Sequence, residues 1–160
     1  MTVMQPNRKD MAEFFRLSLH AGICTPATVV QWADRIVAAD ASPHIAFIEL
    51  CMSAFQPASA VGTLLGDVPG QATADLSVQM LLGYAARLIA ERTFAPEELL
   101  LRLYRLAGSE FPGSIYFELV GLESAYICAR DGVFGTVAEV MEDFATFLAN
   151  HVRYAPDLSM

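Results

Sequence analysis

Residues 29–50, VVQWADRIVAADASPHIAFIEL, contain the only tryptophan of the chain and two apolar patterns separated by Ser42-Pro43. In the first pattern, apolar residues recur every three or four positions, as in a helix that buries one face. Serine followed by proline is typical of a helix start, so the second pattern predicts a new helix from His44 to Met52. The stretch therefore predicts two helices that pack through their apolar faces. A large aromatic ring on such a face most often belongs to the core, and we expect this of Trp32.

The rest of the chain shows the same helical periodicity between glycine and proline signals. Gly22 follows the first apolar segment, where glycine commonly ends a helix, and Thr136 and Glu139 have capping-box spacing before the last segment. No run alternates for long enough to predict a strand. The predicted helices cover approximately residues 8–21, 26–39, 44–52, 57–66, 71–92, 96–108, 112–130 and 137–148.

This pattern predicts an all-α fold, a bundle of six to eight helices with short connections. A chain of 160 residues can bury a core of its own, so we expect a single domain over residues 1–160. We expect residues 1–7 and 155–160 to be mobile. The segment from Pro112 to Arg130 is apolar nearly all round, apart from a narrow strip of Ser114, Glu118 and Gly121, which predicts a central helix.

The chain is more apolar than an average soluble protein, with 54% hydrophobic residues. A large core explains part of this excess, and an apolar surface covered by another copy or another protein would explain the rest. The longest uncharged stretch, Leu50 to Gly66, contains Gln56 and Pro57 and is too interrupted to span a membrane. The N-terminal segment is too polar for a signal peptide. We therefore expect a cytoplasmic protein that does not bind membranes.

The formal net charge is −8, and most of it lies after Leu106. A nucleic-acid-binding protein places lysine and arginine on phosphates, so this balance predicts no nucleic-acid partner. A basic protein partner fits the charge, and so does an acidic surface that only keeps the chain soluble.

The last predicted helix is the candidate partner-binding surface. Its spacing places Glu139, Glu142, Asp143 and Thr146 together, opposite an apolar face. No lysine or arginine lies between Asp131 and His151, so this helix cannot neutralise its own carboxylates. We expect these side chains to be exposed and to contact a basic partner.

Glu49 and Glu118 are the candidate pocket residues because each lies in a very apolar helix. A buried carboxylate needs a partner or a proton and would mark a site between helices. The alternative is that each lies on the solvated edge of its helix. The three cysteines are widely spaced and predict reduced, buried thiols.

Several catalytic classes are disfavoured by missing residue patterns. Lys9 is the only lysine, so a phosphate-binding loop of the usual type is excluded, and no histidine has the Glu-x-x-His spacing of di-iron bundles. We expect no metal, no cofactor and no catalytic residue that the sequence identifies. A nucleophile assembled from distant residues stays open.

Three runs, GICTPATVVQWADRIV (22–37), SPHIAFIEL (42–50) and DGVFGTVAEVMEDFATFL (131–148), resemble a loose group of small bacterial all-helical acidic proteins, most of them uncharacterised. The shared elements are Trp32-Ala33-Asp34, Ile48-Glu49-Leu50 and Gly132 to Thr136. Some members of this group are similar to immunity proteins that neutralise toxins. The resemblance implies a helical binding protein and transfers no catalytic residue.

Three functional hypotheses follow. The first is a non-enzymatic protein of immunity type that neutralises a basic protein partner, conceivably a nuclease, through its acidic surface. The second is a structural or adaptor protein that self-associates, which would use the apolar excess. The third is a small-molecule enzyme or binding protein with a pocket between helices near Glu49 or Glu118.

Overall fold

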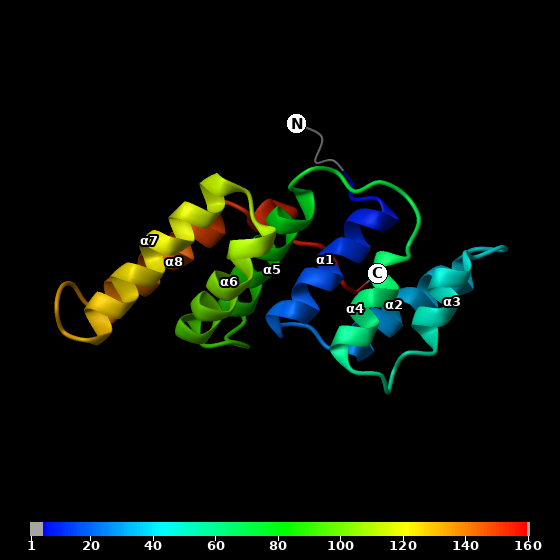
Figure 1. Cartoon of the computed structure of the whole chain (residues 1–160), viewed down its shortest axis with the longest axis horizontal. Coiled ribbons are helices and arrows are strands. Elements are labelled where there is room, and N and C mark those ends of the chain that lie inside the picture. Colours follow the sequence, from blue (N-terminus) through cyan, green and yellow to red (C-terminus); the bar gives the residue numbers. More distant parts are fainter. Residues whose placement is uncertain (1–4, 160) are drawn as a thin grey trace. The chain divides into compact units, whose positions relative to one another are not determined.

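The computed structural model describes residues 5–159, and within that range it is all-α, with eight helices and no strand (Figure 1). The prediction of an all-helical fold is confirmed. The helices are α1 (Arg8–Ala21), α2 (Pro26–Ala39), α3 (Ile45–Cys51), α4 (Ala58–Gly66), α5 (Leu76–Ala90), α6 (Pro96–Glu110), α7 (Gly113–Arg130) and α8 (Val137–Ala149), followed by a 3-10 turn, Val152–Tyr154.

The contacts within the chain divide it into two compact units. Unit 1 holds the described residues up to Ser77 together with residues 157–159, and unit 2 is Val78–Pro156. Helices α1 to α4 belong to unit 1, whereas α6, α7 and α8 belong to unit 2. The division into two units does not test the prediction of one domain over residues 1–160, which stays a prediction.

The core of unit 1 is an aromatic cluster in which α1, α2 and α3 meet. Trp32 is only 7% exposed, which confirms its predicted place in the core. Its ring centroid lies 5.1 Å from that of Phe15 on α1 and 5.6 Å from that of Phe47 on α3. The apolar pattern of residues 29–50 thus packs two helices against each other and against α1.

A buried carboxylate joins the start of α1 to a distant loop. Asp10 is 1% exposed and accepts hydrogen bonds from the backbone N–H of Asn7 (2.9 Å) and of Thr73 (2.6 Å). Asn7 in turn caps α1, and its side-chain amide donates to the carbonyl of Gln71. These bonds keep residues 71–75 out of a helix, and Asp75 has a positive φ of 62°. The predicted helix start at residue 71 is therefore wrong, and α5 begins at Leu76.

A glycine can end a helix by adopting the left-handed conformation, but not every glycine does so. Gly22 does so after α1, with φ 72°, as predicted. Gly108 does not end α6, which continues to Glu110. The helix ends at Phe111, which is extended because the following residue is Pro112. The predicted end at Gly108 was wrong for this reason.

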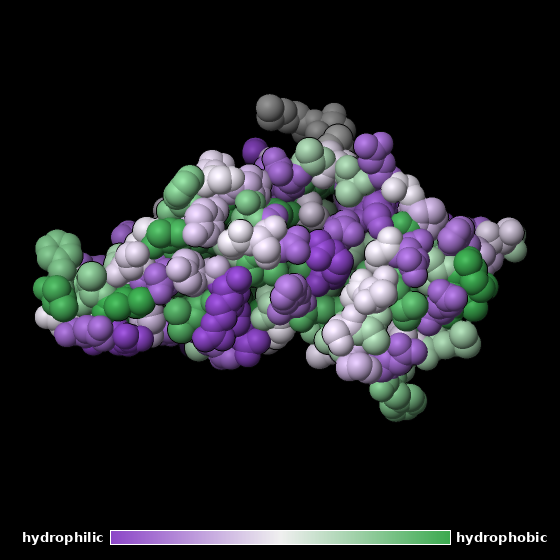
Figure 2. Space-filling model, in the orientation of Figure 1, coloured by the Kyte–Doolittle hydropathy of each residue, from purple (hydrophilic) through white to green (hydrophobic). Residues whose placement is uncertain are grey.

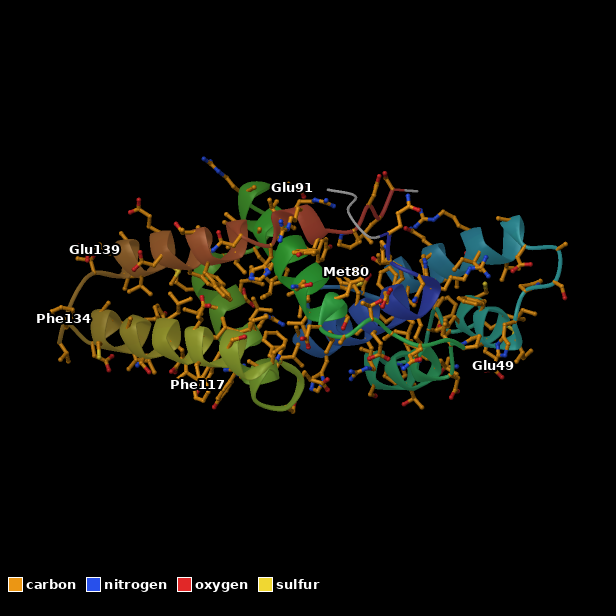
Figure 3. The ribbon with its side chains drawn as sticks, turned by 90° about the horizontal axis from the view of Figure 1, so that it is seen from above. Glu49, Met80, Glu91, Phe117, Phe134 and Glu139 are labelled. Atoms are coloured by element: carbon orange, nitrogen blue, oxygen red, sulfur yellow. The ribbon has the colours of Figure 1, made fainter. Side chains whose placement is uncertain are left out.

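Helices α7 and α8 form an antiparallel hairpin in unit 2, and α7 also contacts α6 (Figure 1). Leu119 is the one buried residue among the residues of α7, all of which the structure describes. The predicted central position of this helix was wrong because α6 and α8 cover only part of its circumference. The predicted polar strip of Ser114, Glu118 and Gly121 is exposed, and Phe117 beside it points away from α8 (Figure 3).

Both ends of the described chain make specific contacts. Pro156 is buried, its carbonyl accepts a hydrogen bond from Arg87 (2.8 Å), and the carbonyl of Leu158 accepts one from Arg35 (3.1 Å). The expected mobility of residues 1–7 and 155–160 stays a prediction. Residues 1–4 and 160 lie outside the described residues.

Candidate functional site

The acidic face of α8 has the geometry that its sequence predicts. Thr136 caps the helix by accepting a hydrogen bond from the backbone N–H of Glu139 at 3.2 Å. The side chains of the predicted surface are all exposed, which confirms their expected position; they are Glu139, Glu142, Asp143 and Thr146. On the opposite face Val140, Phe144 and Leu148 are buried. We call the four exposed residues the α8 surface.

The carboxylates of the α8 surface have no positive partner in the described part of the chain. None of Glu139, Glu142 and Asp143 takes part in an ion pair between residues 5 and 159. Beside them Ala138, Ala145 and Ala149 are also exposed. Small side chains let another chain approach the helix closely, so the surface combines access with unbalanced negative charge.

The loop that joins α7 to α8 presents an exposed phenylalanine next to the α8 surface (Figure 3). The backbone N–H groups of Val133 and Phe134 both donate to the carbonyl of Cys128, at 2.9 and 3.4 Å, and the loop glycines have positive φ. The backbone is therefore fixed, yet the side chain of Phe134 is 82% exposed. A Cβ placed on Gly135 would lie 3.9 Å from a carboxylate oxygen of Glu139, so the loop adjoins the acidic face.

The two candidate pocket residues belong to different units, and neither is buried. Glu118 is exposed on α7, and Glu49 is partly exposed on α3. The solvated-edge alternative describes both positions.

The sequence did not identify His151, whose ring packs edge-on against Phe147 in unit 2. Its Nδ1 is buried with no hydrogen-bond partner among the described residues. Burial holds the pKa of His151 below its ordinary value, and the negative charge of Glu118 opposes this shift.

The cysteine thiols are free and partly buried. Burial raises the pKa of Cys24 to about 11, and burial together with Asp34 raises that of Cys51 to about 11. A thiol with a raised pKa is a poor nucleophile at neutral pH. Between residues 5 and 159 no group of three or more histidine, cysteine or acidic side chains is placed to hold a metal ion. No helix in the same range is both long enough and apolar enough to cross a bilayer.

A second exposed surface lies on α3, and the sequence analysis missed it. Four large apolar side chains are exposed there: Ile45 (58%) and Ile48 (37%) on α3, and Met52 (72%) and Phe55 (103%) in the connection that follows it. We call them the α3 face. Figure 2 shows hydrophobic side chains projecting from the α3–α4 connection and from the α7–α8 loop. The sequence shows that these residues are apolar, but it does not tell whether another part of the chain covers them.

Comparisons with protein families, with curated proteins and with solved structures gave no match to this chain.

Proposed function

We propose that the protein is a non-enzymatic binding protein that holds a basic protein partner through the α8 surface. The observation that carries this proposal is the row of exposed carboxylates on α8 that no arginine or lysine of the described chain neutralises. A partner with lysine and arginine side chains would supply the missing charge. Electrostatic complementarity of this kind raises the association rate and fixes the partner's orientation.

Phe134 supplies what the carboxylates lack, an apolar anchor. Binding energy at protein interfaces concentrates in a few buried side chains, often aromatic, surrounded by polar groups. The α7–α8 loop carries this exposed ring, and Gly135, the next residue, adjoins Glu139 (Figure 3). The partner should therefore present an apolar pocket with a basic rim. An immunity-type protein that neutralises a toxin such as a nuclease is the form of this function that the resemblance of residues 22–37, 42–50 and 131–148 favours.

The double variant E142Q/D143N tests the proposal. Both side chains are exposed, so folding stability should stay within about 0.5 kcal/mol of the wild type. Association with the partner should become slower and less sensitive to salt. The measurement is affinity capture from the source cell at low and moderate salt, followed by association kinetics with the purified partner.

The matched control is D67N/E91Q, which removes the same charge from exposed positions outside α8. It should capture the same basic protein as the wild type, whereas E142Q/D143N should lose it. Equal capture by both double variants would rule out the α8 surface as the binding site.

A second function, self-association, is favoured by the α3 face. A stable interface buries roughly 800 Å² on each partner, and a large aromatic side chain alone contributes roughly 150–250 Å². Four large apolar side chains, two of them more than 70% exposed, supply a substantial part of that area. We propose a second copy of the chain as the occupant, because a symmetric pair covers the same face on both copies.

A further inference from the structure

A groove of about 520 Å³ lies between α1 and α4 in unit 1. The α4 residues that line it carry no side chain larger than threonine. A Cβ placed on Gly62 would meet only Cγ of Arg16, at 3.9 Å, and Leu19 of α1 adds apolar surface. The groove therefore has room for a large side chain, and part of its wall is apolar.

One end of the groove lies beside the connection that carries Phe55, a member of the α3 face. Lys9 near the start of α1 donates to the carbonyl of Gly66 at the end of α4, so the two helices run antiparallel. The start of α4 therefore lies near the end of α1, and Ala58 lines the groove there, three residues after Phe55. Every residue from 54 to 59 is exposed, so no covered residue separates the ring from the groove along the chain.

The ring of Phe55 does not lie in the groove of its own chain, because its side chain is 103% exposed. The backbone beside it is nevertheless fixed. Ser53 is buried, its hydroxyl donates to the carbonyl of Leu50 at 2.6 Å, and its own carbonyl accepts from the N–H of Gln56 at 3.0 Å. A ring that is exposed on a fixed backbone can be buried by a second molecule at a low cost in ordering.

We propose that two copies of the chain exchange these rings, so that Phe55 of each copy lies in the groove between α1 and α4 of the other. This inference rests on the proposed self-association and names the surface that the α3 face meets. A two-fold axis makes the two contacts identical, and each ring buries roughly 150–250 Å². Leu19, Ala58 and Gly62 are the groove residues that the ring covers.

Two variants each remove one half of the contact. Phe55→Ser removes the ring and leaves the groove, whereas Gly62→Leu fills the groove and leaves the ring. Each should raise the dimer dissociation constant by about a hundredfold, because a homodimer loses two contacts of about tenfold each. An equal mixture of the two variants should dimerise about tenfold more weakly than the wild type, because the ring of one fits the open groove of the other. Light scattering over a dilution series measures the wild type, both variants and the mixture.

The matched controls change the same residue types elsewhere. Gly121→Leu adds the same side chain to an open face of α7, and Phe117→Ser removes a ring that is 70% exposed. Both should dimerise as the wild type does. Amide NMR spectra report whether each variant is folded, and Ala58→Leu fills the same groove if Gly62→Leu does not fold.

A direct measurement uses a mixture of ¹³C-labelled and unlabelled wild-type chains. Nuclear Overhauser effects between the two kinds of chain should join the ring protons of Phe55 to the methyl groups of Leu19 and Ala58. Overhauser effects that join the ring only to α3 of the other copy would overturn the exchange.

The outcomes separate this inference from the self-association on which it rests. A wild type that stays monomeric would exclude both. A dimeric wild type whose folded Gly62→Leu variant dimerises equally well would keep the α3 face as an interface and overturn the groove as its partner. The groove would also be overturned if the mixture of variants stayed monomeric at about thirtyfold the wild-type dissociation constant.

Discussion

At the scale of single residues, Gly83 fixes the path of the C-terminal segment of unit 2. It lies in the middle of α5, where glycine weakens a helix relative to alanine. A Cβ at this position would lie 2.4 Å from the carbonyl oxygen of His151 and 2.7 Å from the backbone nitrogen of Ala155. Both neighbours are backbone atoms, which cannot rotate away. Residues 151–155 can approach α5 this closely because Gly83 has no side chain.

Gly83→Ala should therefore destabilise the protein by about 1–3 kcal/mol or more, as overpacking does. The control is Gly121→Ala on α7, where a Cβ would meet nothing within 4 Å. That change should stabilise the protein by about 0.5–1 kcal/mol through helix propensity alone. Urea unfolding followed by circular dichroism measures both. A neutral Gly83→Ala would mean that the C-terminal segment does not pack against α5 in solution.

At the scale of helices, the sequence predicted correctly those helix starts and ends that depend on neighbouring residues. The glycine after α1, the proline at the start of α2 and the threonine before α8 all act within a few residues, and the structure confirms them. The start of α5 depends on Asp10, which lies 63 residues from Thr73 in the chain, and no local pattern reports such a bond. The exposure of α3 and α7 depends on which helices cover them. The apolar pattern of a helix is the same whether its face is covered or exposed, so the sequence does not report it.

The α8 surface, too, could be predicted from the sequence only in part. The one-sided periodicity of the last helix was enough to predict that Glu139, Glu142 and Asp143 are exposed. The aromatic anchor beside them was missed, because an apolar residue such as Phe134 in a loop reads as one more core residue. The structure shows instead that Phe134 is 82% exposed, on a loop whose backbone N–H groups donate to the carbonyl of Cys128.

The packing of α1, α2 and α3 around one ring makes a direct prediction about Trp32. Trp32→Ala should lower the free energy of unfolding by about 3–5 kcal/mol, because it leaves a cavity between Phe15 and Phe47. Trp32→Phe should cost less, since a smaller ring still fills part of the space. Chemical denaturation followed by circular dichroism gives both values. If Trp32→Ala unfolds like the wild type, the ring does not support the core.

At the scale of the whole molecule, the apolar excess of the sequence is not all core. Large apolar side chains remain exposed on the α3 face of unit 1 and on the α7–α8 loop of unit 2 (Figure 2). Two such surfaces on one small protein offer two different contacts. The proposed assignments give the α3 face to a second copy and the loop to the basic partner.

The wild type should accordingly form a dimer at micromolar concentration that persists in about 0.5 M salt, because screening does not weaken apolar contacts. The double variant M52K/F55S should be a monomer with unchanged stability, since both side chains are exposed. The matched variant V133S/F134S removes comparable apolar surface from the loop and should stay dimeric. Light scattering after size exclusion measures all three. A monomeric wild type, or a dimer broken by the loop variant instead, would exclude the α3 face as the dimer interface.

The bond between Asp10 and Thr73 has a consequence for the order in which the chain folds. Asp10 caps the first turn of α1 locally with Asn7 and also accepts a hydrogen bond from Thr73, which is 63 positions away in the chain. Closing a long loop costs entropy before the contact rewards it, so contacts of this kind form late. Because α2, α3 and α4 lie between the two residues, this one hydrogen bond closes a loop that contains three helices, and we expect it to form after them.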